Sequence, residues 1–254
     1  MTETLLLDTY LKQLRLPLFA QHYRKLASEA AQNQLGYEAF LLALAEQEVT
    51  QRQKNQQVRR VQAAHFPVLK DLAEFDFSAL PNLNKTLILD LARGHYIAQA
   101  QPIILVGNPG LGKTHIATGL ALAACRQGRP VRFYNAAGLV NDLLQAQDKH
   151  QLPRFLAQAL KQQVIVLDEL GFLPLSPAGA HLIFQFCSAV YERVALIVTT
   201  NLRFGDWVQI FQDERLTGAL LDRLTHRAQI VEFVGDSFRL RQSLQRQTAG
   251  ERMA

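Results

Sequence analysis

The sequence predicts an α/β domain with a parallel β-sheet between two layers of helices, preceded by a small all-helical N-terminal domain. From Gln101 onward, short runs rich in Val and Ile alternate with helix-like segments; the runs are PIILVG, VRFYN, VIVLDE, ALIVTTN and AQIVEFVG. Each run is apolar on both faces, as is typical of a strand in a parallel sheet that helices cover on both sides. Before this region, leucines and aromatic residues recur every three or four positions, which is the helical period.

This pattern divides the chain into three parts. We expect residues 1–66 to form the helical domain, residues 67–100 an irregular connector and residues 101–254 the α/β domain. The connector contains DLAEFDFSALPNLNK, in which turn-forming residues interrupt any helical period. Its Phe75 and Phe77 are expected to pack onto the α/β domain.

Length and composition limit the class of protein. A chain of 254 residues is long enough for one α/β domain with a helical appendage and too short for two large domains. Its two cysteines, Cys125 and Cys187, lie in apolar helix-like stretches, which disfavours a disulfide framework and favours a reducing compartment. The N-terminus lacks the basic flank of a secretory signal, and no apolar run is long enough to span a bilayer. We therefore expect a cytoplasmic protein with no membrane partner.

A polar, basic helix is predicted at residues 50–64, TQRQKNQQVRRVQAA, which contain no acid. Its basic residues are Arg52, Lys54, Arg59 and Arg60. Such a helix can lie along the phosphates of DNA, and the net charge of +5 with a pI near 9.4 fits an anionic partner. The alternative is a solvated helix face or a linker, which is the commoner meaning of a charge run taken alone.

A phosphate-binding loop is the strongest motif in the sequence. It consists of Gly107, Asn108, Pro109, Gly110, Leu111, Gly112, Lys113 and Thr114. These residues match G-x-x-x-x-G-K-[ST] between a predicted strand and a predicted helix, the context that the motif requires. Glycines let backbone N–H groups surround phosphates, Lys113 reaches the β- and γ-phosphates of ATP, and the Thr114 hydroxyl ligates Mg²⁺. The alternative, an ordinary glycine-rich turn, leaves the Lys-Thr pair in register unexplained.

Polar side chains follow two further predicted strands. Asp168 and Glu169 end the run VIVLDE, where the carboxyl edge of a parallel sheet binds ligands. We expect Asp168 to hold Mg²⁺ and Glu169 to act as general base toward the attacking water. Asn201 follows the run ALIVTTN and is placed to contact the γ-phosphate or this water, although taken alone it reads as a turn residue or helix cap.

The order and spacing of these motifs resemble a known family. GNPGLGKTH, VIVLDELGFLPL, IVTTN, LLDRLTHRA and GDSFRLRQS look like the IstB-type transposition helper ATPases, AAA+ proteins related to the DnaC and DnaI helicase loaders. The segments LKQLRLPLFAQHY and EFDFSALPNLNK resemble the same proteins, so the similarity covers nearly the whole chain.

The resemblance implies further site residues. Arg223 in LLDRLTH corresponds to the arginine finger that enters a neighbouring subunit's ATP site, with Arg215 and Arg227 as rivals, and Arg239 in GDSFR corresponds to sensor 2. After the last predicted strand, near Phe233, about twenty residues remain, too few for the helical lid of typical AAA+ proteins. The resemblance therefore implies an AAA+ domain without a C-terminal helical lid.

The function implied is that of an ATP-dependent transposition helper. Such a protein binds ATP and Mg²⁺, self-associates into ATP- and DNA-dependent oligomers on double-stranded target DNA, and recruits and stimulates a cognate DDE transposase of the IstA type. The alternative within the same resemblance is a replicative helicase loader of the DnaC/DnaI type. Two other classes remain open: a small-molecule kinase, although Glu169 with Asn201 suits water better than a metabolite, and a DNA-binding module that does not turn over its ATP.

Overall fold

The computed structural model describes residues 2–172, 174–235 and 237. The chain divides into two compact units, Met1–Arg59 and Arg60–Ala254, and the division falls inside helix α3. The boundaries predicted after residues 66 and 100 stay predictions. No helix in the described residues is both long enough and apolar enough to cross a membrane.

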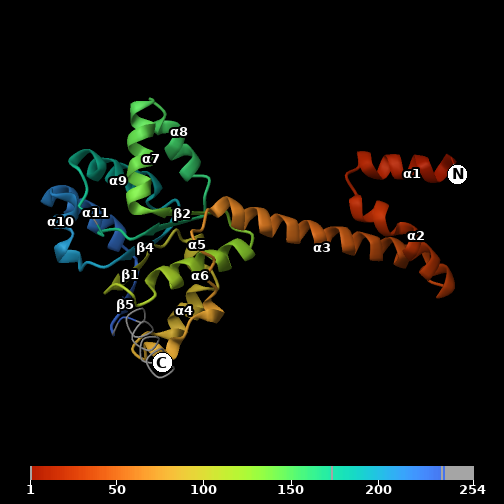
Figure 1. The fold of residues 1–254 in the computed structure, drawn as a ribbon, viewed down its shortest axis with the longest axis horizontal. Coiled ribbons are helices and arrows are strands. Elements are labelled where there is room, and N and C mark those ends of the chain that lie inside the picture. Colours follow the sequence, from red (N-terminus) through yellow and green to blue (C-terminus); the bar gives the residue numbers. More distant parts are fainter. Residues whose placement is uncertain (1, 173, 236, 238–254) are drawn as a thin grey trace, which may run out of the picture. The chain divides into compact units, whose positions relative to one another are not determined.

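The first unit is helical, as its leucine spacing predicts. It contains α1 (Thr2–Gln13), α2 (Pro17–Gln32) and most of α3 (Tyr37–Ala64) (Figure 1). Pro17 begins α2, where its fixed φ suits a helix and its missing N–H costs no hydrogen bond.

A buried carboxylate joins the three helices of this unit. Glu48 of α3 is only 5% exposed. Its carboxylate accepts a hydrogen bond from the backbone N–H of Leu18 at 3.0 Å and one from Nε of Arg52 at 2.8 Å. Arg52 also donates to the carbonyl oxygen of Arg15, in the turn between α1 and α2. Arg52, predicted as a DNA contact, is thus engaged inside its own unit.

Replacing Glu48 by Ala is expected to destabilise the helical unit by about 1–3 kcal/mol, because the Leu18 N–H and the Arg52 guanidinium lose a charged partner. Hydrogen exchange of α1 and α2 amides in the full chain measures the change. Glu46→Ala removes an exposed carboxylate from the same helix and is the matched control. Equal protection in the two variants would contradict the bridging role of Glu48.

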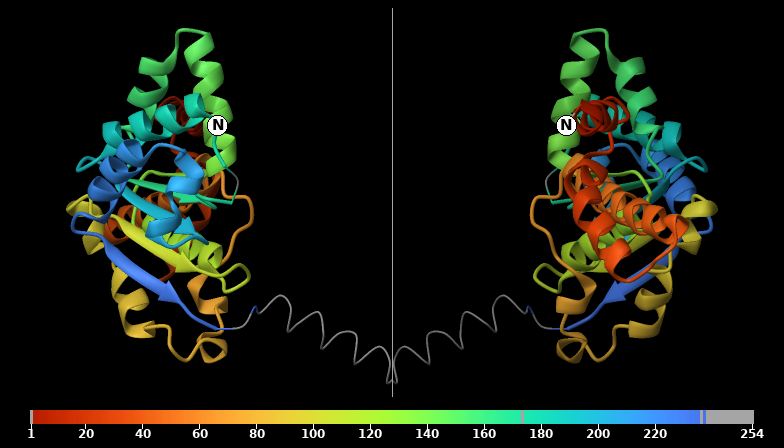
Figure 2. Two further views of the ribbon diagram at one scale, coloured as in Figure 1. Left: turned by 90° about the vertical axis from the view of Figure 1, so that its left-hand side faces the viewer. Right: turned by 90° about the vertical axis from the view of Figure 1, so that its right-hand side faces the viewer.

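The second unit is built on a five-stranded parallel sheet in the order β2-β3-β4-β1-β5, with β5 (blue arrow) at one edge (Figure 2). The strands are β1 (Ile103–Gly107), β2 (Val131–Asn135), β3 (Val164–Asp168), β4 (Ala195–Thr200) and β5 (Gln229–Phe233). All five lie within the predicted runs, so the predicted parallel sheet is confirmed.

Helices cover both faces of the sheet (Figure 1). The remaining elements are η1 (Leu72–Glu74), η2 (Phe77–Ala79), α4 (Lys85–Leu91), α5 (His95–Ala98), α6 (Lys113–Arg126), α7 (Ala136–Asp148), α8 (Leu152–Ala159), α9 (Pro177–Val190), η3 (Phe204–Asp206), α10 (Val208–Phe211) and α11 (Glu214–Thr225). Within the described residues, no helix follows β5.

Two hydrophobic cores separate these helices into layers. Strand side chains point alternately to the two faces: Ile103 and Leu105 pack with α4, α5 and α6, whereas Ile104 packs with α7, α9 and α11. Phe75 and Phe77 of the connector pack against the first of these cores, as predicted. The arrangement is the predicted three-layer α/β fold, and it brings the ends of β1, β3 and β4 to one edge.

Candidate nucleotide site

The phosphate-binding loop connects β1 to α6 and turns where only glycine fits. A Cβ on Gly107 would lie 2.3 Å from the carbonyl oxygen of Phe233 on the neighbouring strand β5. Gly112, just before α6, has φ +87°, in the left-handed region that favours glycine. The loop therefore approaches its neighbours at backbone distance, and its N–H groups stay available for an anion.

The side chain of Lys113 folds back onto the backbone of the phosphate-binding loop. It is 8% exposed, and its ammonium group donates to the carbonyl oxygens of Gly107 at 2.6 Å and Asn108 at 2.8 Å. These bonds hold the cation at the start of α6, where the helix N-terminus also favours negative charge. The loop thus presents a positive site for phosphate.

Asp168 lies at the end of β3 beside two hydroxyl groups. Its Oδ1 accepts hydrogen bonds from Thr114 at 3.0 Å and from Thr199 at 2.6 Å. Burial raises the pKa of Asp168, and the two hydroxyl donors oppose this rise by stabilising the carboxylate. A nearby cation would favour the charged form further, so the group is suited to a metal ion.

Glu169 turns away from Asp168 because its backbone is left-handed, with φ +59°. Its N–H donates to the hydroxyl oxygen of Thr199 at 2.8 Å, and its carboxylate accepts from the amide of Asn135 at 2.9 Å. Asn135 ends β2, directly beside Asp168 in the sheet register, and also caps the N-terminus of α7. The two carboxylates therefore point in different directions from one strand end.

Asn135 and Thr199 are site residues that our sequence reasoning missed. The signal for Asn135 was present, since the run VRFYN ends in a polar residue at the same edge as the other predicted strands. Thr199 lies in the run ALIVTTN, in which Asn201, two residues further on, is the predicted functional residue. Neither contact follows from the sequence, because strand order decides which ends are adjacent.

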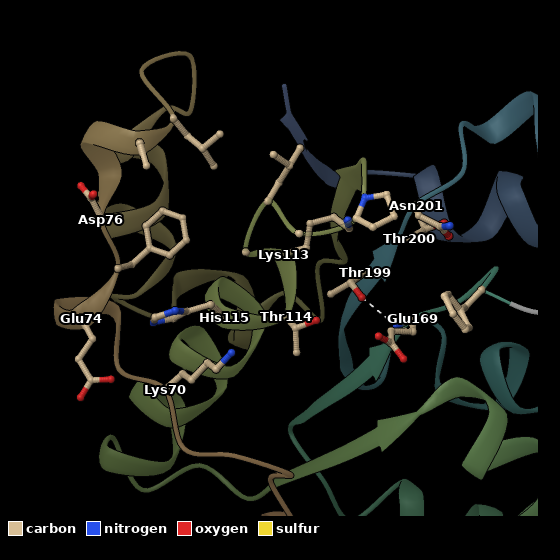
Figure 3. A pocket seen from close by; sticks show the side chains of 18 residues that line it. Lys70, Glu74, Asp76, Lys113, Thr114, His115, Glu169, Thr199, Thr200 and Asn201 are labelled. Atoms are coloured by element: carbon tan, nitrogen blue, oxygen red, sulfur yellow. Dashed lines mark hydrogen bonds between the residues drawn. The ribbon is translucent and has the colours of Figure 1, made fainter. Parts of the chain in front are cut away.

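A cavity of about 490 Å³ lies over the loop and Glu169. The residues around it are Lys70, Glu74, Phe75, Asp76, Ala79, Leu80, Pro109 to His115, Glu169, Phe172 and Thr199 to Asn201. In Figure 3, the connector residues Glu74 and Asp76 lie on one side of Lys113, and Glu169 and Asn201 on the other. The side-chain oxygen of Asn201 is buried with no hydrogen-bond partner among the described residues, which marks it for a ligand.

The connector forms one wall of this cavity. The Phe75 ring packs edge-on against His115, with ring centroids 5.2 Å apart, and the His115 ring bonds to the carbonyl oxygen of Asp71 at 2.7 Å. Asp71 also pairs with Arg126 at the end of α6, at 2.5 Å. Contacts at both ends of α6 thus hold the connector against the loop.

Gly112→Ala is expected to destabilise the second unit by about 1–3 kcal/mol more than Gly128→Ala. Both glycines have φ +87°, so the backbone strain is matched, but a Cβ at Gly112 meets the Phe75 ring at 2.6 Å whereas Gly128 faces open space. Urea unfolding followed by fluorescence of Trp207, the single tryptophan and fully buried, measures the difference. An equal loss of unfolding free energy in the two variants would show that the Phe75 ring can move aside without destabilising the protein.

Arg223 and its rivals Arg215 and Arg227 are not among the residues that line the cavity of their own chain. Arg223 of α11 donates to the hydroxyl of Ser188, and its guanidinium lies 4.7 Å from the ring centre of Phe184. Its rivals Arg215 and Arg227 are exposed. Arg239 lies outside the described residues.

The predicted DNA contacts fall into two pairs. Arg52 and Arg60 have internal partners: Arg52 binds Glu48, and Arg60 donates to the carbonyl oxygen of Cys125 at 3.0 Å. Lys54 and Arg59 are exposed. The acceptor of Arg60 lies 65 residues away along the chain, so the sequence pattern did not reveal it. Glu48, in contrast, lies only four residues before Arg52 on the same helix, just outside the acid-free stretch 50–64.

The residues present fit ATP and Mg²⁺. Thr114 and Asp168 offer hard oxygen donors of the kind that Mg²⁺ prefers, and Mg²⁺ commonly binds through one or two carboxylates and the phosphates of a nucleotide. Thr114, Asp168 and the loop would hold the ion together with the nucleotide.

A phosphate-binding loop between β1 and α6, with two carboxylates at the end of β3, defines a P-loop nucleotide-binding protein of the AAA+ fold. Comparison with known families gives the particular group: a model described as IstB-like ATP binding protein matches residues 9–246. The chain belongs to this family, which confirms the resemblance drawn from its motifs.

Curated relatives agree with this family assignment, and a solved structure agrees with the fold. The insertion sequence IS232 putative ATP-binding protein of Bacillus thuringiensis subsp. berliner is 34% identical over 235 residues, 92% of this chain and 94% of the relative. The IS5376 putative ATP-binding protein of Geobacillus stearothermophilus is 34% identical over 233 residues, covering 92% and 93%. The structure of replication initiator DnaA bound to AMPPCP and single-stranded DNA matches 65% of this chain and 50% of that one, with a TM-score of 0.53 and 18% identity, which shows a shared fold.

Proposed function

We propose that this protein is an ATP-hydrolysing transposition helper that assembles on double-stranded target DNA and recruits and stimulates a DDE transposase of the IstA type. One observation carries the proposal: a chain of the IstB-like family brings to one cavity a P-loop lysine, the Glu169 carboxylate and an asparagine oxygen with no partner among the described residues, while Asp168 bonds to Thr114 of the same loop. The names of its relatives, as ATP-binding proteins of insertion sequences, supply the biological setting.

Each residue has a role in hydrolysis that its contacts support. Lys113, held at the rim of the loop, binds the β- and γ-phosphates. Glu169 accepts a proton from the attacking water, and the amide of Asn135 orients its carboxylate. The side-chain oxygen of Asn201 can accept a hydrogen bond from the attacking water, and its amide N–H can donate one to the γ-phosphate. A Mg²⁺ ion held by Thr114 and Asp168 would neutralise phosphate charge.

Two substitutions separate binding from chemistry. Lys113→Ala is expected to weaken ATP binding by about tenfold or more, because a charge-assisted contact to phosphate is lost. Glu169→Gln is expected to keep the affinity and slow hydrolysis by about a hundredfold, as loss of a general base predicts. Nucleotide titration and steady-state phosphate release measure the two effects. Undiminished turnover in Glu169→Gln would assign the base elsewhere, and undiminished affinity in Lys113→Ala would contradict the nucleotide site itself.

Arg223 is proposed as the finger that completes a neighbouring subunit's site. Arg223 is not among the residues that line the cavity of its own chain, as action in trans requires. Its contacts with the ring of Phe184 and the hydroxyl of Ser188 hold the guanidinium between α11 and α9. A finger in trans makes hydrolysis depend on self-association, so ATP turnover reports assembly.

DNA binding is proposed for the exposed cations of α3. Lys54 and Arg59 point to solvent, whereas Arg52 and Arg60 are engaged in the fold. Contacts of this kind reach phosphates and carry no base information. The basic net charge of the chain supports an anionic partner.

The double variant Lys54→Gln/Arg59→Gln is expected to lose affinity for duplex DNA and to reduce the salt slope of binding by about two, one unit for each phosphate contact. Sedimentation with duplex DNA and a nonhydrolysable ATP analogue measures assembly, and a salt titration gives the slope.

Lys12→Gln/Lys25→Gln removes the same charge from exposed positions of the same unit and is the matched control. A wild-type slope in the first variant would move the DNA surface elsewhere. A wild-type protein that remains monomeric with DNA and nucleotide together would contradict the proposed function. Co-purification with a replicative helicase in place of a transposase would favour the helicase-loader alternative.

A further inference from the structure

The hydroxyl of Thr199 connects the two carboxylate residues of the site. It donates to Oδ1 of Asp168 at 2.6 Å and accepts the backbone N–H of Glu169 at 2.8 Å, the bond drawn as a dashed line in Figure 3. The carbonyl oxygen of the same residue accepts the N–H of Leu170 at 2.9 Å. One residue of β4 therefore binds three successive residues at the end of β3, Asp168 to Leu170.

We infer that Thr199 is a positioning residue that assigns separate tasks to Asp168 and Glu169, an inference that rests on the proposed ATPase function. It holds the first carboxylate toward the loop and fixes the backbone turn that sends the second toward the water. Nothing in the sequence motifs assigns it this role, since Asn201 is the polar residue expected at this strand end.

The turn needs such a support because Glu169 is left-handed, at φ +59°, a conformation that is unfavourable for a residue other than glycine. Its N–H is held by the Thr199 side chain, and its carboxylate by Asn135. Without the hydroxyl, the N–H of Glu169 loses its acceptor next to a residue already under strain. The direction of the general base is therefore sensitive to this one oxygen atom.

The same hydroxyl also decides which oxygen of Asp168 is available. Thr199 and Thr114 both donate to Oδ1. Because Thr114 is itself a proposed Mg²⁺ ligand, the bond from Thr199 is the one that does not depend on the metal. Thr199 is 1% exposed and Asp168 5% exposed, so water cannot easily replace a lost donor.

Three variants test the inference. Thr199→Val removes the hydroxyl at nearly constant volume, and Thr199→Ser keeps it. Thr118→Val is the matched control, because the Thr118 hydroxyl in α6 is equally buried and has no partner among the described residues. Binding of a fluorescent ATP analogue is measured in EDTA and across a Mg²⁺ titration, and kcat and KM are measured with DNA present.

Thr199→Val is expected to raise the Mg²⁺ concentration for half-maximal binding by about tenfold and to lower kcat by about tenfold or more, as loss of a group that orients a metal ligand predicts. Its affinity in EDTA should match that of Thr118→Val, because Lys113 and the loop are intact. Thr199→Ser should resemble the wild type.

Two results would overturn the inference: a Mg²⁺ requirement and kcat equal to those of Thr118→Val, or a loss of metal-free affinity as large as the loss with Mg²⁺, which would reveal a general structural role. If Thr199→Val does not fold, Thr199→Ala carries the same expectations. Failure of the proposed function is distinguishable, because it appears as normal nucleotide affinity in Lys113→Ala regardless of Thr199.

Discussion

The parallel pairing of β1, β3 and β4 is the constraint on which the site depends. The register sets Val106 beside Thr200 and Leu167 beside Val198, so the residues after each strand meet at one edge. Parallel strands place their carboxyl ends together, and helices that start there point N–H groups at the same space. The phosphate loop, the carboxylates and the asparagine are neighbours for this reason alone.

Several charged and polar groups are buried at this edge of the sheet, where burial is unfavourable. Specific hydrogen bonds offset the unfavourable burial of the charged groups among them. Burial raises the pKa of Asp168, and hydroxyl groups from α6 and β4 stabilise its charged form. The amide of Asn135 holds Glu169, and backbone carbonyls hold Lys113. The buried side-chain oxygen of Asn201 has no partner within the part of the chain that the structure describes, which is tolerable where a ligand supplies one.

In the helical unit, a charged pair stabilises the fold instead of forming a ligand site. Glu48 and Arg52 form a partly buried pair that also satisfies backbone groups of the turn between α1 and α2. Of the four cations expected to face DNA, Arg52 pairs with Glu48, and Arg60 donates to the carbonyl oxygen of Cys125 near the C-terminus of α6. A basic stretch in a sequence is therefore an upper bound on the charge that a helix presents to a partner.

The fold class, the strands and the phosphate loop could be predicted from the sequence, because they depend on local periodicity and on a motif whose residues are contiguous. The sequence also located Asp168, Glu169 and Asn201, since polar residues at the ends of apolar strands share one edge in any parallel sheet. The tertiary structure was needed to reveal the contacts of Thr199 and Asn135, the packing of Phe75 on Gly112, and the bonds from Arg52 to Arg15 and from Arg60 to Cys125. Each of these depends on strand order or on residues far apart in the chain, and the spacing of residues along a sequence does not encode which distant atoms come within hydrogen-bonding distance.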